Sequence, residues 1–466
     1  MDATIAVEKK SFFKEESEFL KDILSLRFFE IWKNPNLAQD ENFEDLRQES
    51  RLELYITSTC NQHCEYCYLW KYPEIYPSEI NKSEQILKNL GILLDWMIEN
   101  EFFIPEIDLF TGEIWHSSFG LQILDLIYEK IQAGFRCGSF IVPSNCSFLN
   151  DKRAWGEIQR RINKFKDIGC PLVFSISVDG AVVEKKARPK NNGFENLDKF
   201  YDNMFIFAKH NNFKFHPMVA ACDIEDWIEN YHWWEQMCQK YDISTDWLMM
   251  LEVRNADWTQ DKIQAYNNFM DYLIDKEVKK YGSPQKFFEE FYSCASAEIR
   301  PDLSYVPYLF SDAESVAGCT VGNTLTVRLG DLAICPCHRT AYHKLIYGKF
   351  KVENDKIVDI IGNNPAVATR ILLANNLNAS LKCDTCRYKG FCLQGCFGSQ
   401  IEATGDPFMP IPSVCEFFSG KINHLVQKYI SMGFLDYLLS IQPGNDFYPR
   451  AQVLLDKIGG ICKCMV

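Results

Sequence analysis

The chain has 466 residues, of which 47% are hydrophobic and 14% aromatic, so it can bury a large core and is not intrinsically disordered. Its formal net charge of −14 argues against a general nucleic-acid binder, which needs a basic surface to neutralise phosphates. The N-terminus has no signal-peptide pattern, and no apolar run reaches the roughly 20 residues of a membrane span. We therefore expect a cytoplasmic protein with no nucleic-acid and no membrane partner.

Residues 1–50 are polar and helix-prone, with one amphipathic helix predicted in "FLKDILSLRFFEIW" and a short second helix near 42–50. From residue 51 onward, apolar runs of strand length alternate with helical patterns. The predicted strands are 51–57, 105–112, 138–145, 171–180, 213–221 and 246–253, and the predicted helices are 83–100, 119–132, a stretch within 151–168, 195–210, 227–241 and 261–281.

Continuous apolar strands separated by helices are typical of a parallel sheet covered by helices. The sequence therefore predicts an α/β fold with a partial (βα)6 barrel, in which ligands bind at the C-terminal ends of the strands. The alternation stops near Ser283, where short segments and many turn residues begin. We expect four regions: an N-terminal helical segment (1–50), the barrel (51–282), a loop-rich domain held by metal (283–420) and a helical tail (421–466).

The cysteines are the unusual feature of the composition, because there are 19 of them and no export signal. In such a chain metal or redox chemistry is favoured over disulfides. Most of the cysteines occur in groups along the chain. Five scattered ones are predicted to be buried small hydrophobic residues: Cys137, Cys146, Cys170, Cys222 and Cys238.

The first group lies in "CNQHCEYC", directly after the first predicted strand. A structural zinc site needs four ligands, commonly supplied as two pairs. Here Cys60, Cys64 and Cys67 supply three thiols, which would hold three irons of a [4Fe–4S] cluster and leave the fourth iron without a protein ligand. The alternative is a zinc site with His63 as its fourth ligand.

The spacing C-x3-C-x-aromatic-C after a first barrel strand resembles the signature of the radical S-adenosylmethionine (radical SAM) superfamily. Cys60, Cys64, Tyr66 and Cys67 occupy its positions. The resemblance implies that Cys60, Cys64 and Cys67 form the catalytic cluster and that its open iron binds S-adenosylmethionine. One electron would then cleave this molecule to a 5′-deoxyadenosyl radical that abstracts a hydrogen atom from the substrate.

Other cofactor-binding residues are implied by the same resemblance. Thr111, Gly112 and Glu113 stand where the family has Gly-Gly-Glu, so Gly112 would let the backbone approach closely and Glu113 would accept from the methionyl ammonium. Thr111 departs from the first glycine of that motif, which puts this part of the match in doubt. Ile114 likewise stands where proline is usual.

At the end of the third predicted strand, Ser144 and Asn145 are candidates for the ribose. After the fourth, "SISVDG" followed by "KKARP" resembles the family's Ser-x-Asp-Gly…Arg pattern, so Ser177 and Arg188 would contact the ribose or the carboxylate. The alternative for each is a polar residue at a strand end that is bonded to the backbone.

The later cysteines resemble a SPASM domain, which holds two auxiliary [4Fe–4S] clusters. By this resemblance Cys319, Cys335 and Cys396 would hold the first cluster, and Cys294 or Cys337 would complete it. The second cluster would have four ligands, Cys383, Cys386, Cys392 and Cys415. The expected cofactors are thus three clusters and S-adenosylmethionine. Cys462 and Cys464 match no position of the pattern.

SPASM enzymes mostly modify peptides or proteins. The resemblance is greatest to maturases of ribosomally made peptides, and within them to the ranthipeptide type, which forms thioether crosslinks from cysteine sulfur to an acceptor carbon on precursors with repeated Cys-x-x-x units. The expected partners are a precursor peptide with a leader and a cysteine-containing core, and an electron donor of the flavodoxin or ferredoxin type. Alternatives are a sulfatase-maturing enzyme, a peptide epimerase, a carbon–carbon crosslinking maturase, or an iron–sulfur carrier or scaffold that does not cleave S-adenosylmethionine.

Overall fold

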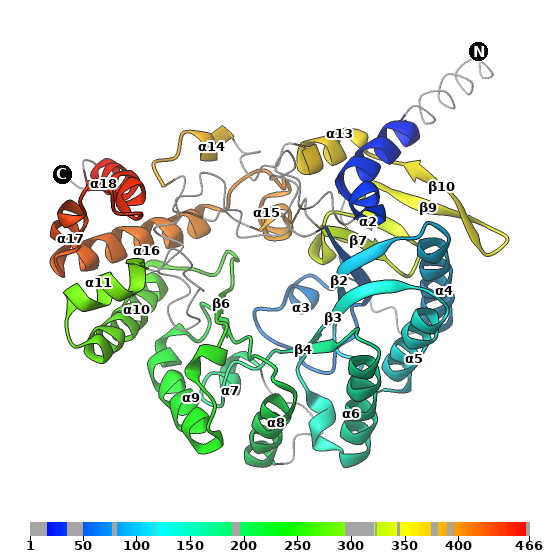
Figure 1. The fold of residues 1–466 in the computed structure, drawn as a ribbon, viewed down its shortest axis with the longest axis horizontal. Helices are drawn as coiled ribbons and strands as arrows, with labels where there is room; N and C mark the ends of the chain where they lie inside the picture. The colour runs from blue at the N-terminus through cyan, green and yellow to red at the C-terminus, as the bar shows by residue number, and fades with distance from the viewer. Residues whose placement is uncertain are drawn as a thin grey trace. The chain divides into compact units, whose positions relative to one another are not determined.

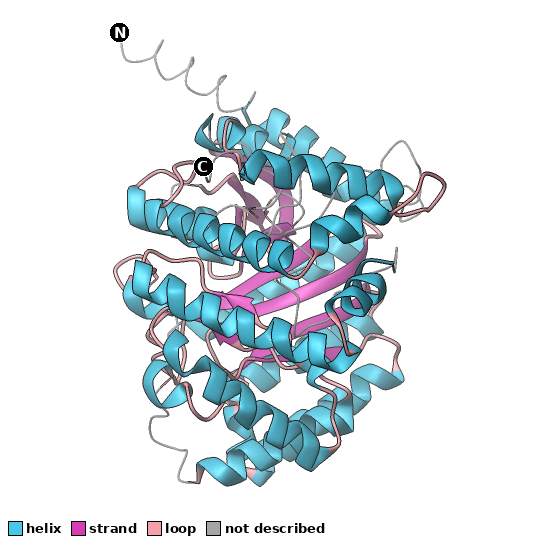
Figure 2. Ribbon diagram, turned by 90° about the vertical axis from the view of Figure 1, so that its left-hand side faces the viewer, coloured by secondary structure: helices cyan, strands magenta, loops and turns pink. Residues whose placement is uncertain are grey.

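The structure is a computed structural model, shown in Figure 1 and Figure 2. It forms two compact units that alternate along the sequence. The first comprises Met1–Ser177, Pro189–Phe213 and Thr320–Asn376, and the second comprises Val178–Arg188, Lys214–Cys319 and Leu377–Val466. The residues that the structure describes are 16–34, 50–76, 82–115, 117–188, 196–293, 321, 324–342, 345–373, 381–388, 392 and 396–462. Within these ranges, no helix has the length and apolar character needed to cross a membrane.

The first unit is built on an eight-stranded sheet with the order β10-β9-β8-β7-β1-β2-β3-β4. The strands β1 to β4 lie side by side in chain order, and each is parallel to the next. They match the first four predicted strands. Helices follow these strands, and Figure 1 shows α4, α5 and α6 on their outer side. The elements are β1 (Arg51–Thr57), α3 (Tyr68–Lys71), α4 (Ser83–Glu99), β2 (Phe103–Thr111), α5 (Ser118–Gln132), β3 (Arg136–Ser144), α6 (Lys152–Asp167), β4 (Leu172–Ile176) and α8 (Leu197–Asn211).

Four more strands extend this sheet on the other side of β1, and the sequence did not indicate them. The strand β7 (Thr324–Arg328) runs parallel to β1. The next three strands are antiparallel to their neighbours. They are β8 (Ala333–Cys335), β9 (Gly348–Glu353) and β10 (Lys356–Gly362), and α13 (Pro365–Ala368) follows. Short strands have little local sequence pattern, because their stability depends on the strands with which they pair. The prediction of short segments over 283–420 therefore did not include β7 to β10.

The predicted N-terminal amphipathic helix is confirmed. Residues 16–24 are helical and continue through a π-helical turn (Ser25–Phe29) into α2 (Glu30–Lys33). Its aromatic side chains pack in the first unit, where Phe29 lies 5.6 Å from Trp96 and 5.5 Å from Phe102 between ring centroids. Trp32 is fully buried and donates its indole N–H to the carbonyl of Ser50 at 2.8 Å. The short helix predicted near 42–50 lies outside the described residues.

The second unit contains the fifth and sixth predicted strands, which are only two residues long and pair with each other in parallel. The helix predicted over 227–241 has its aromatic residues Trp227, Tyr231 and Trp234 in the core. The elements are α7 (Glu184–Ala187), β5 (Met218–Val219), α9 (Trp227–Tyr241), β6 (Leu251–Glu252), α10 (Gln260–Tyr281), α11 (Pro284–Ser293), α14 (Leu381–Asp384), α15 (Phe397–Thr404), α16 (Pro412–Ser431), α17 (Phe434–Ser440) and α18 (Tyr448–Cys462).

A buried ion pair joins two elements of the second unit. Lys421 on α16 binds Glu252 on β6, and the hydroxyl of Tyr266 on α10 donates to the same carboxylate at 2.7 Å. Trp258 and Phe417 stack beside them with centroids 4.0 Å apart. The aromatic packing and the shared carboxylate together fix α16 against α10 and β6.

The five scattered cysteines largely follow their prediction. Four of them are buried, and Cys222 is half-buried. The buried four are Cys137, Cys146, Cys170 and Cys238.

Candidate active site

The loop that follows β1 carries the three clustered cysteines, and hydrogen bonds shape both of its ends. The hydroxyl of Thr57, the last residue of β1, accepts from the backbone N–H of Thr59 at 3.1 Å. At the other end, the backbone N–H of Cys67 donates to the carbonyl of Cys64 at 3.0 Å, and Cys67 begins α3. Tyr66 lies half-buried within this turn. Hydrogen bonds therefore fix the backbone at both ends of the loop that carries Cys60, Cys64 and Cys67.

The electrostatics of Cys60 reveal which groups surround it. Burial is the main cause that raises the pKa of the Cys60 thiol to about 12, and the nearby charges of Glu113, Cys64 and Cys67 add to the rise. The backbone N–H of Gln62 donates to the Cys60 sulfur at 3.4 Å and acts in the opposite direction. The thiol is therefore protonated at neutral pH.

The three thiols of this loop are donors of the kind that an iron–sulfur cluster requires. Among the described residues no group of three or more His, Cys, Asp or Glu side chains is arranged to hold one metal ion. His63, the fourth ligand of the zinc alternative, stacks on Trp70 with centroids 3.6 Å apart.

The end of β2 lies against the cysteine loop and requires a glycine there. The backbone N–H of Glu113 donates to the carbonyl of Thr59 at 2.8 Å. A Cβ atom at Gly112 would lie 2.1 Å from the Thr59 carbonyl oxygen and 3.0 Å from the Cβ of Cys60, so no larger residue fits without moving the loop. Thr111 is the last residue of β2. The glycine of the predicted motif is thus explained by the close approach of two chain segments.

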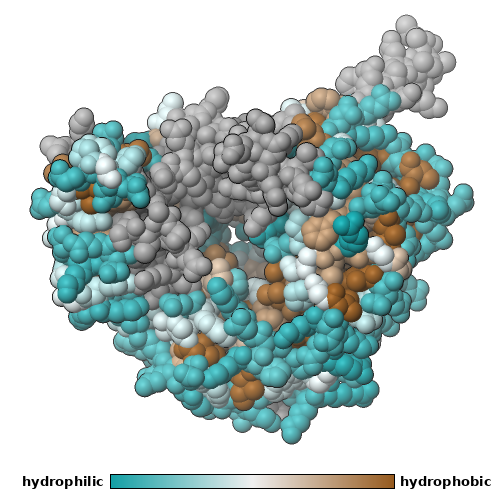
Figure 3. Space-filling model, in the orientation of Figure 1, coloured by the Kyte–Doolittle hydropathy of each residue, from teal (hydrophilic) through white to brown (hydrophobic). Residues whose placement is uncertain are grey.

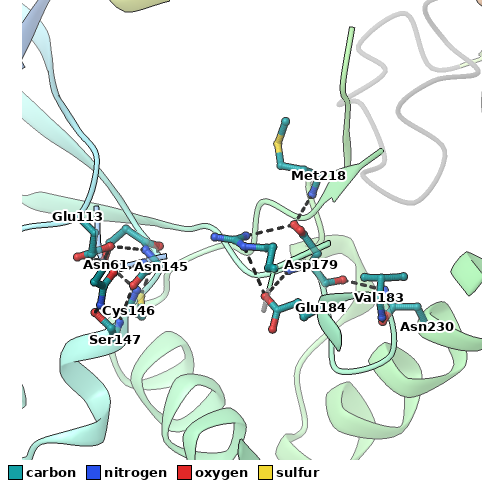
Figure 4. Close-up of polar contacts among 12 residues, drawn as sticks. Asn61, Glu113, Asn145, Cys146, Ser147, Asp179, Val183, Glu184, Met218 and Asn230 are labelled. Atoms are coloured by element: carbon teal, nitrogen blue, oxygen red, sulfur yellow. Dashed lines mark hydrogen bonds and ion pairs between the residues drawn. The ribbon is translucent and has the colours of Figure 1, made fainter. Parts of the chain in front are cut away.

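The carboxylate of Glu113 is buried and is held by the end of β3 (Figure 4). It accepts hydrogen bonds from the Ser144 hydroxyl at 3.0 and 3.2 Å and from the backbone N–H of Asn145 at 2.6 Å. The Asn145 side-chain amide donates to the side-chain oxygen of Asn61 at 2.9 Å, and the side-chain N–H of Asn61 donates in turn to the Ser147 hydroxyl at 2.9 Å. The structure therefore brings the candidates of two strand ends together with the cysteine loop.

Asn61 and Ser147 complete this network, and the sequence analysis did not select them. The position of Asn61 directly after Cys60 was a weak indication that its side-chain amide could form hydrogen bonds in the cysteine loop. Ser147 opens the 3-10 turn Ser147–Asn150 after β3 and carried no signal of its own. Their bond joins segments 86 residues apart in the chain, which only the tertiary structure reveals.

Ser177 and Arg188 lie in different units. In the first unit, the backbone N–H of Ser177 donates to the carbonyl of Ser144 at 2.8 Å, so the end of β4 is bonded to the end of β3. In the second unit, Arg188 is buried and forms ion pairs with Asp179 at 3.3 Å and Glu184 at 3.8 Å. The guanidinium of Arg188 is thus engaged by two carboxylates of its own unit.

The Asp-Gly pair of "SISVDG" has a structural role in the second unit (Figure 4). The Asp179 carboxylate accepts from the backbone N–H of Met218 at 2.8 Å, and its carbonyl accepts from Asn230 and Trp234 at 2.7 and 2.9 Å. Gly180 has φ = +117°, and a Cβ atom there would lie 2.4 Å from the Asn230 side chain. Both residues therefore clamp this segment to β5 and α9.

The later cysteines divide between the two units. In the first, Cys335 on β8 is fully buried, and burial raises the pKa of its thiol. Cys337 is also buried, and its backbone N–H donates to the Thr340 hydroxyl at 3.1 Å.

In the second unit, Cys383 and Cys386 share a turn, in which the N–H of Cys386 donates to the carbonyl of Cys383 at 3.2 Å. The pKa of the Cys415 thiol is raised by burial and then by the nearby Cys383 and Cys386, so three of the four residues predicted for the second auxiliary cluster lie within electrostatic range. Cys392 donates its N–H to the carbonyl of Tyr388, and Cys396 begins α15. Cys294, Cys319 and Cys464 lie outside the described residues.

A second polar cluster in the first unit was missed by the sequence analysis. The His338 ring bonds to the Glu53 carboxylate at 2.8 Å and stacks on Phe110 with centroids 3.6 Å apart. Asp108 pairs directly with Glu53 across β1 and β2, and burial raises the pKa of Asp108 to about 7, with Glu53 and Glu106 adding to the rise. The signal in the sequence was a charged residue inside the apolar run "RLELYIT".

Comparison of the sequence with protein families and with curated proteins gives no match. Solved structures do match. The anaerobic sulfatase-maturing enzyme anSMEcpe with bound AdoMet, in its polyhistidine-tagged form, superposes with a TM-score of 0.52 at 13% identity over 87% of this chain and 98% of that chain. Native anSMEcpe with AdoMet and the Kp18Cys peptide gives 0.51 at 12% identity, over 82% and 98%.

This chain has the fold of anSMEcpe. The predicted α/β class with its parallel sheet is thereby confirmed. In this fold, the cysteine loop, Gly112, Glu113, Ser144 and Asn145 all lie at the C-terminal ends of β1, β2 and β3, the edge at which the sequence predicted ligand binding.

Proposed function

We propose that this chain is a radical SAM enzyme that modifies a ribosomally made precursor peptide by forming thioether crosslinks between cysteine sulfur and a carbon of an acceptor residue. The observation that carries the proposal is the Glu113 carboxylate, which Ser144 and Asn145 hold beside the loop of Cys60, Cys64 and Cys67. When bound, the cluster and S-adenosylmethionine supply one-electron cleavage and hydrogen-atom abstraction.

The residues of the chain have distinct parts in this proposal. Glu113 accepts from the ammonium of S-adenosylmethionine through a charge-assisted hydrogen bond. Gly112 lets β2 approach the cysteine loop, and the bonds of Asn61 with Asn145 and Ser147 fix the loop relative to β3. The N–H of Gln62 stabilises the thiolate form of Cys60.

The remaining assignments follow from the resemblance and are also part of the proposal. The proposed regions are the N-terminal helical segment (1–50), the barrel (51–282), the domain with the auxiliary clusters (283–420) and the helical tail (421–466). Tyr66, Thr111, Ser177 and Arg188 are assigned to the cofactor. Two auxiliary clusters are assigned to Cys319, Cys335 and Cys396, completed by Cys294 or Cys337, and to Cys383, Cys386, Cys392 and Cys415.

A peptide substrate is supported by the structure of anSMEcpe, which was solved with AdoMet and a peptide bound. The same neighbour favours a second candidate, the conversion of a sulfatase cysteine or serine to formylglycine. An epimerase or a carbon–carbon crosslinking maturase would use the same cofactor. A carrier or scaffold would hold the clusters without cleaving S-adenosylmethionine.

The first experiment separates the enzyme from the carrier or scaffold. The anaerobically reconstituted protein, reduced with dithionite, is incubated with S-adenosylmethionine, and 5′-deoxyadenosine is measured. We expect product from the wild type and from Cys222→Ala, which lies outside every motif, and none from Cys60→Ala. Normal product formation by Cys60→Ala would exclude the assignment.

The second experiment decides the product class by mass spectrometry. The enzyme is given a synthetic precursor peptide with repeated Cys-x-x-x units, and in parallel a sulfatase peptide. Thioether formation joins S and C with loss of two hydrogens and retention of the sulfur, whereas formylglycine formation from cysteine removes the sulfur. Turnover of the sulfatase peptide alone would replace the thioether proposal by formylglycine formation.

A further inference from the structure

The exposed face of α6 is basic, although the chain as a whole carries a net charge of −14. The helix reads "KRAWGEIQRRINKFKD", with Lys or Arg at six positions and Asp or Glu at two. Arg161 is buried and binds Asp125. Five basic residues are exposed, namely Lys152, Arg153, Arg160, Lys164 and Lys166. Figure 3 shows hydrophilic residues over the region where Figure 1 places α6.

Two acidic groups near the start of this helix, Glu157 and Asp151, are already engaged. Glu157 binds the guanidinium groups of Arg160 and Arg161. Asp151 caps the helix and accepts from the backbone N–H of Arg153 at 2.7 Å and of Ala154 at 3.2 Å. Lys152 and Arg153 form no ion pair within the described part of the chain, so the first turn presents positive charge to solvent.

Helix stability does not explain this charge. A positive charge in the first turn opposes the helix dipole, an effect of about 0.3–1 kcal/mol. Lys164 and Lys166 in the last turn are favourable to the dipole, but Lys152 and Arg153 are not. Four other long helices carry an acid in the first turn, namely Glu84 of α4, Asp198 of α8, Glu229 of α9 and Asp261 of α10, whereas α5 and α16 have neither an acid nor this pair of cations there.

Gly156 is a second, independent feature of the same face. A glycine inside a helix destabilises it by about 1 kcal/mol relative to alanine. A Cβ atom at Gly156 would meet nothing within 4 Å, so packing does not require the glycine. It lies on the same side of the helix as Arg153 and Arg160, three and four residues away. The face is therefore flat between two arginines and open to close approach by another molecule.

The N-terminal end of α6 is connected to the cysteine loop. Asp151 directly follows the turn Ser147–Asn150. Ser147 accepts a hydrogen bond from Asn61, the neighbour of Cys60. A molecule docked over Lys152 and Arg153 would thus lie next to the segment that touches the loop carrying the proposed cluster.

We propose that the exposed face of α6 docks a small acidic one-electron carrier protein, of the flavodoxin or ferredoxin type, that reduces the cluster at Cys60, Cys64 and Cys67. One electron leaves the carrier, which is oxidised, and enters the cluster, which is reduced; no atoms are transferred. Opposite charges on two protein surfaces speed their encounter and make it sensitive to salt. This inference rests on the proposed function.

The test measures affinity of the full-length, reconstituted protein for oxidised flavodoxin by biolayer interferometry at several ionic strengths. The double variant Lys152→Glu/Arg153→Glu reverses two charges and suits the helix dipole, so it retains the fold. We expect its Kd to rise at least about tenfold at low salt, with a weaker salt dependence. The control Lys88→Glu/Lys356→Glu reverses two exposed charges elsewhere in the first unit and should leave the Kd within about twofold.

Gly156→Leu is a second variant, because it favours the helix and fills the open space. We expect weaker binding from it as well. A Kd equal to the wild-type value in both α6 variants, for flavodoxin and for a ferredoxin tested in parallel, overturns the docking proposal, and so does binding of neither carrier to the wild type. If the wild type reduced by dithionite does not cleave S-adenosylmethionine, the proposed function fails instead.

Discussion

The side chain of Glu113 is held in place by hydrogen bonds from neighbouring residues. Its carboxylate is 1% exposed and accepts from one hydroxyl and one backbone N–H, both supplied by the end of β3. A buried carboxylate is stabilised in its charged form by such donors. The carboxylate is therefore held in one position by the end of β3.

Replacing Glu113 by glutamine tests this assignment, because the shape is kept and the charge is lost. We expect the Kd for S-adenosylmethionine to rise at least about tenfold, since a charge-assisted hydrogen bond contributes about 1.5–3 kcal/mol. Isothermal titration on the reconstituted protein measures the affinity. The exposed Glu99→Gln serves as control. Equal affinities of Glu113→Gln and the wild type would contradict a role for Glu113 in binding.

Asp108 is the other titratable group whose environment stands out in the first unit. Its pKa is raised to about 7, chiefly by burial and then by Glu53 and Glu106, while Arg51 and His338 act in the opposite direction. Because the folded-state pKa exceeds the unfolded value near 3.8, the carboxyl stabilises the fold fully below about pH 4. This contribution is lost as the pH rises toward 7.

Asp108→Asn removes the titration, and thermal unfolding followed by circular dichroism measures the result. We expect the variant to unfold at a higher temperature than the wild type at pH 8 and to lose that advantage near pH 4.5. The difference in stability should change by up to about 1.4 kcal/mol per pH unit between pH 4 and 7. A difference that is the same at both pH values would contradict the raised pKa.

Among the elements, the end of β2 and the cysteine loop approach each other closely. Gly112 lies where a Cβ atom would be 2.1 Å from a backbone oxygen of the loop, and the N–H of Gly112 donates to the carbonyl of Thr57 at 3.0 Å. A strand end and a loop that approach so closely move together. Any substitution at Gly112 therefore displaces the cysteines of the loop.

Gly112→Ala should lower the iron bound by the reconstituted protein and reduce S-adenosylmethionine cleavage more than tenfold, because the clash is with backbone atoms that cannot rotate away. Iron analysis and 5′-deoxyadenosine assays measure the two effects. Gly91→Ala on α4 is the matched control, since its nearest new contact is at 4.0 Å, and it should be neutral or stabilise the helix by up to about 1 kcal/mol. Full iron content in Gly112→Ala would contradict the required close approach.

For the whole molecule, the cysteines assigned to the three proposed clusters predict how much iron the protein binds. Three clusters of equal size are proposed, of which one belongs to Cys60, Cys64 and Cys67. The triple variant with alanine at these positions should therefore retain about two thirds of the wild-type iron and sulfide. Its electron paramagnetic resonance spectrum should no longer change when S-adenosylmethionine is added. Complete loss of iron, or a spectrum that still responds, would contradict three independent clusters.

Much of the fold followed from local pattern. The strands β1 to β4 and the helices between them were predicted within a few residues, because buried parallel strands are continuous apolar runs and amphipathic helices have a regular period. The fifth and sixth strands are only two residues long, so the strand lengths predicted from their apolar runs, 213–221 and 246–253, were too great. Strands β7 to β10 were not predicted, because their pairing with β1 and with one another is a contact between distant segments.

The same division holds for the site. The sequence by itself determined the spacing of Cys60, Cys64 and Cys67, because spacing depends only on the order of the residues. Only the tertiary structure decided that Ser144 and Asn145 hold Glu113 and that Asn61 joins the loop to Ser147. Hydrogen bonds between residues 31 to 86 positions apart depend on how strands lie side by side, which no local pattern specifies.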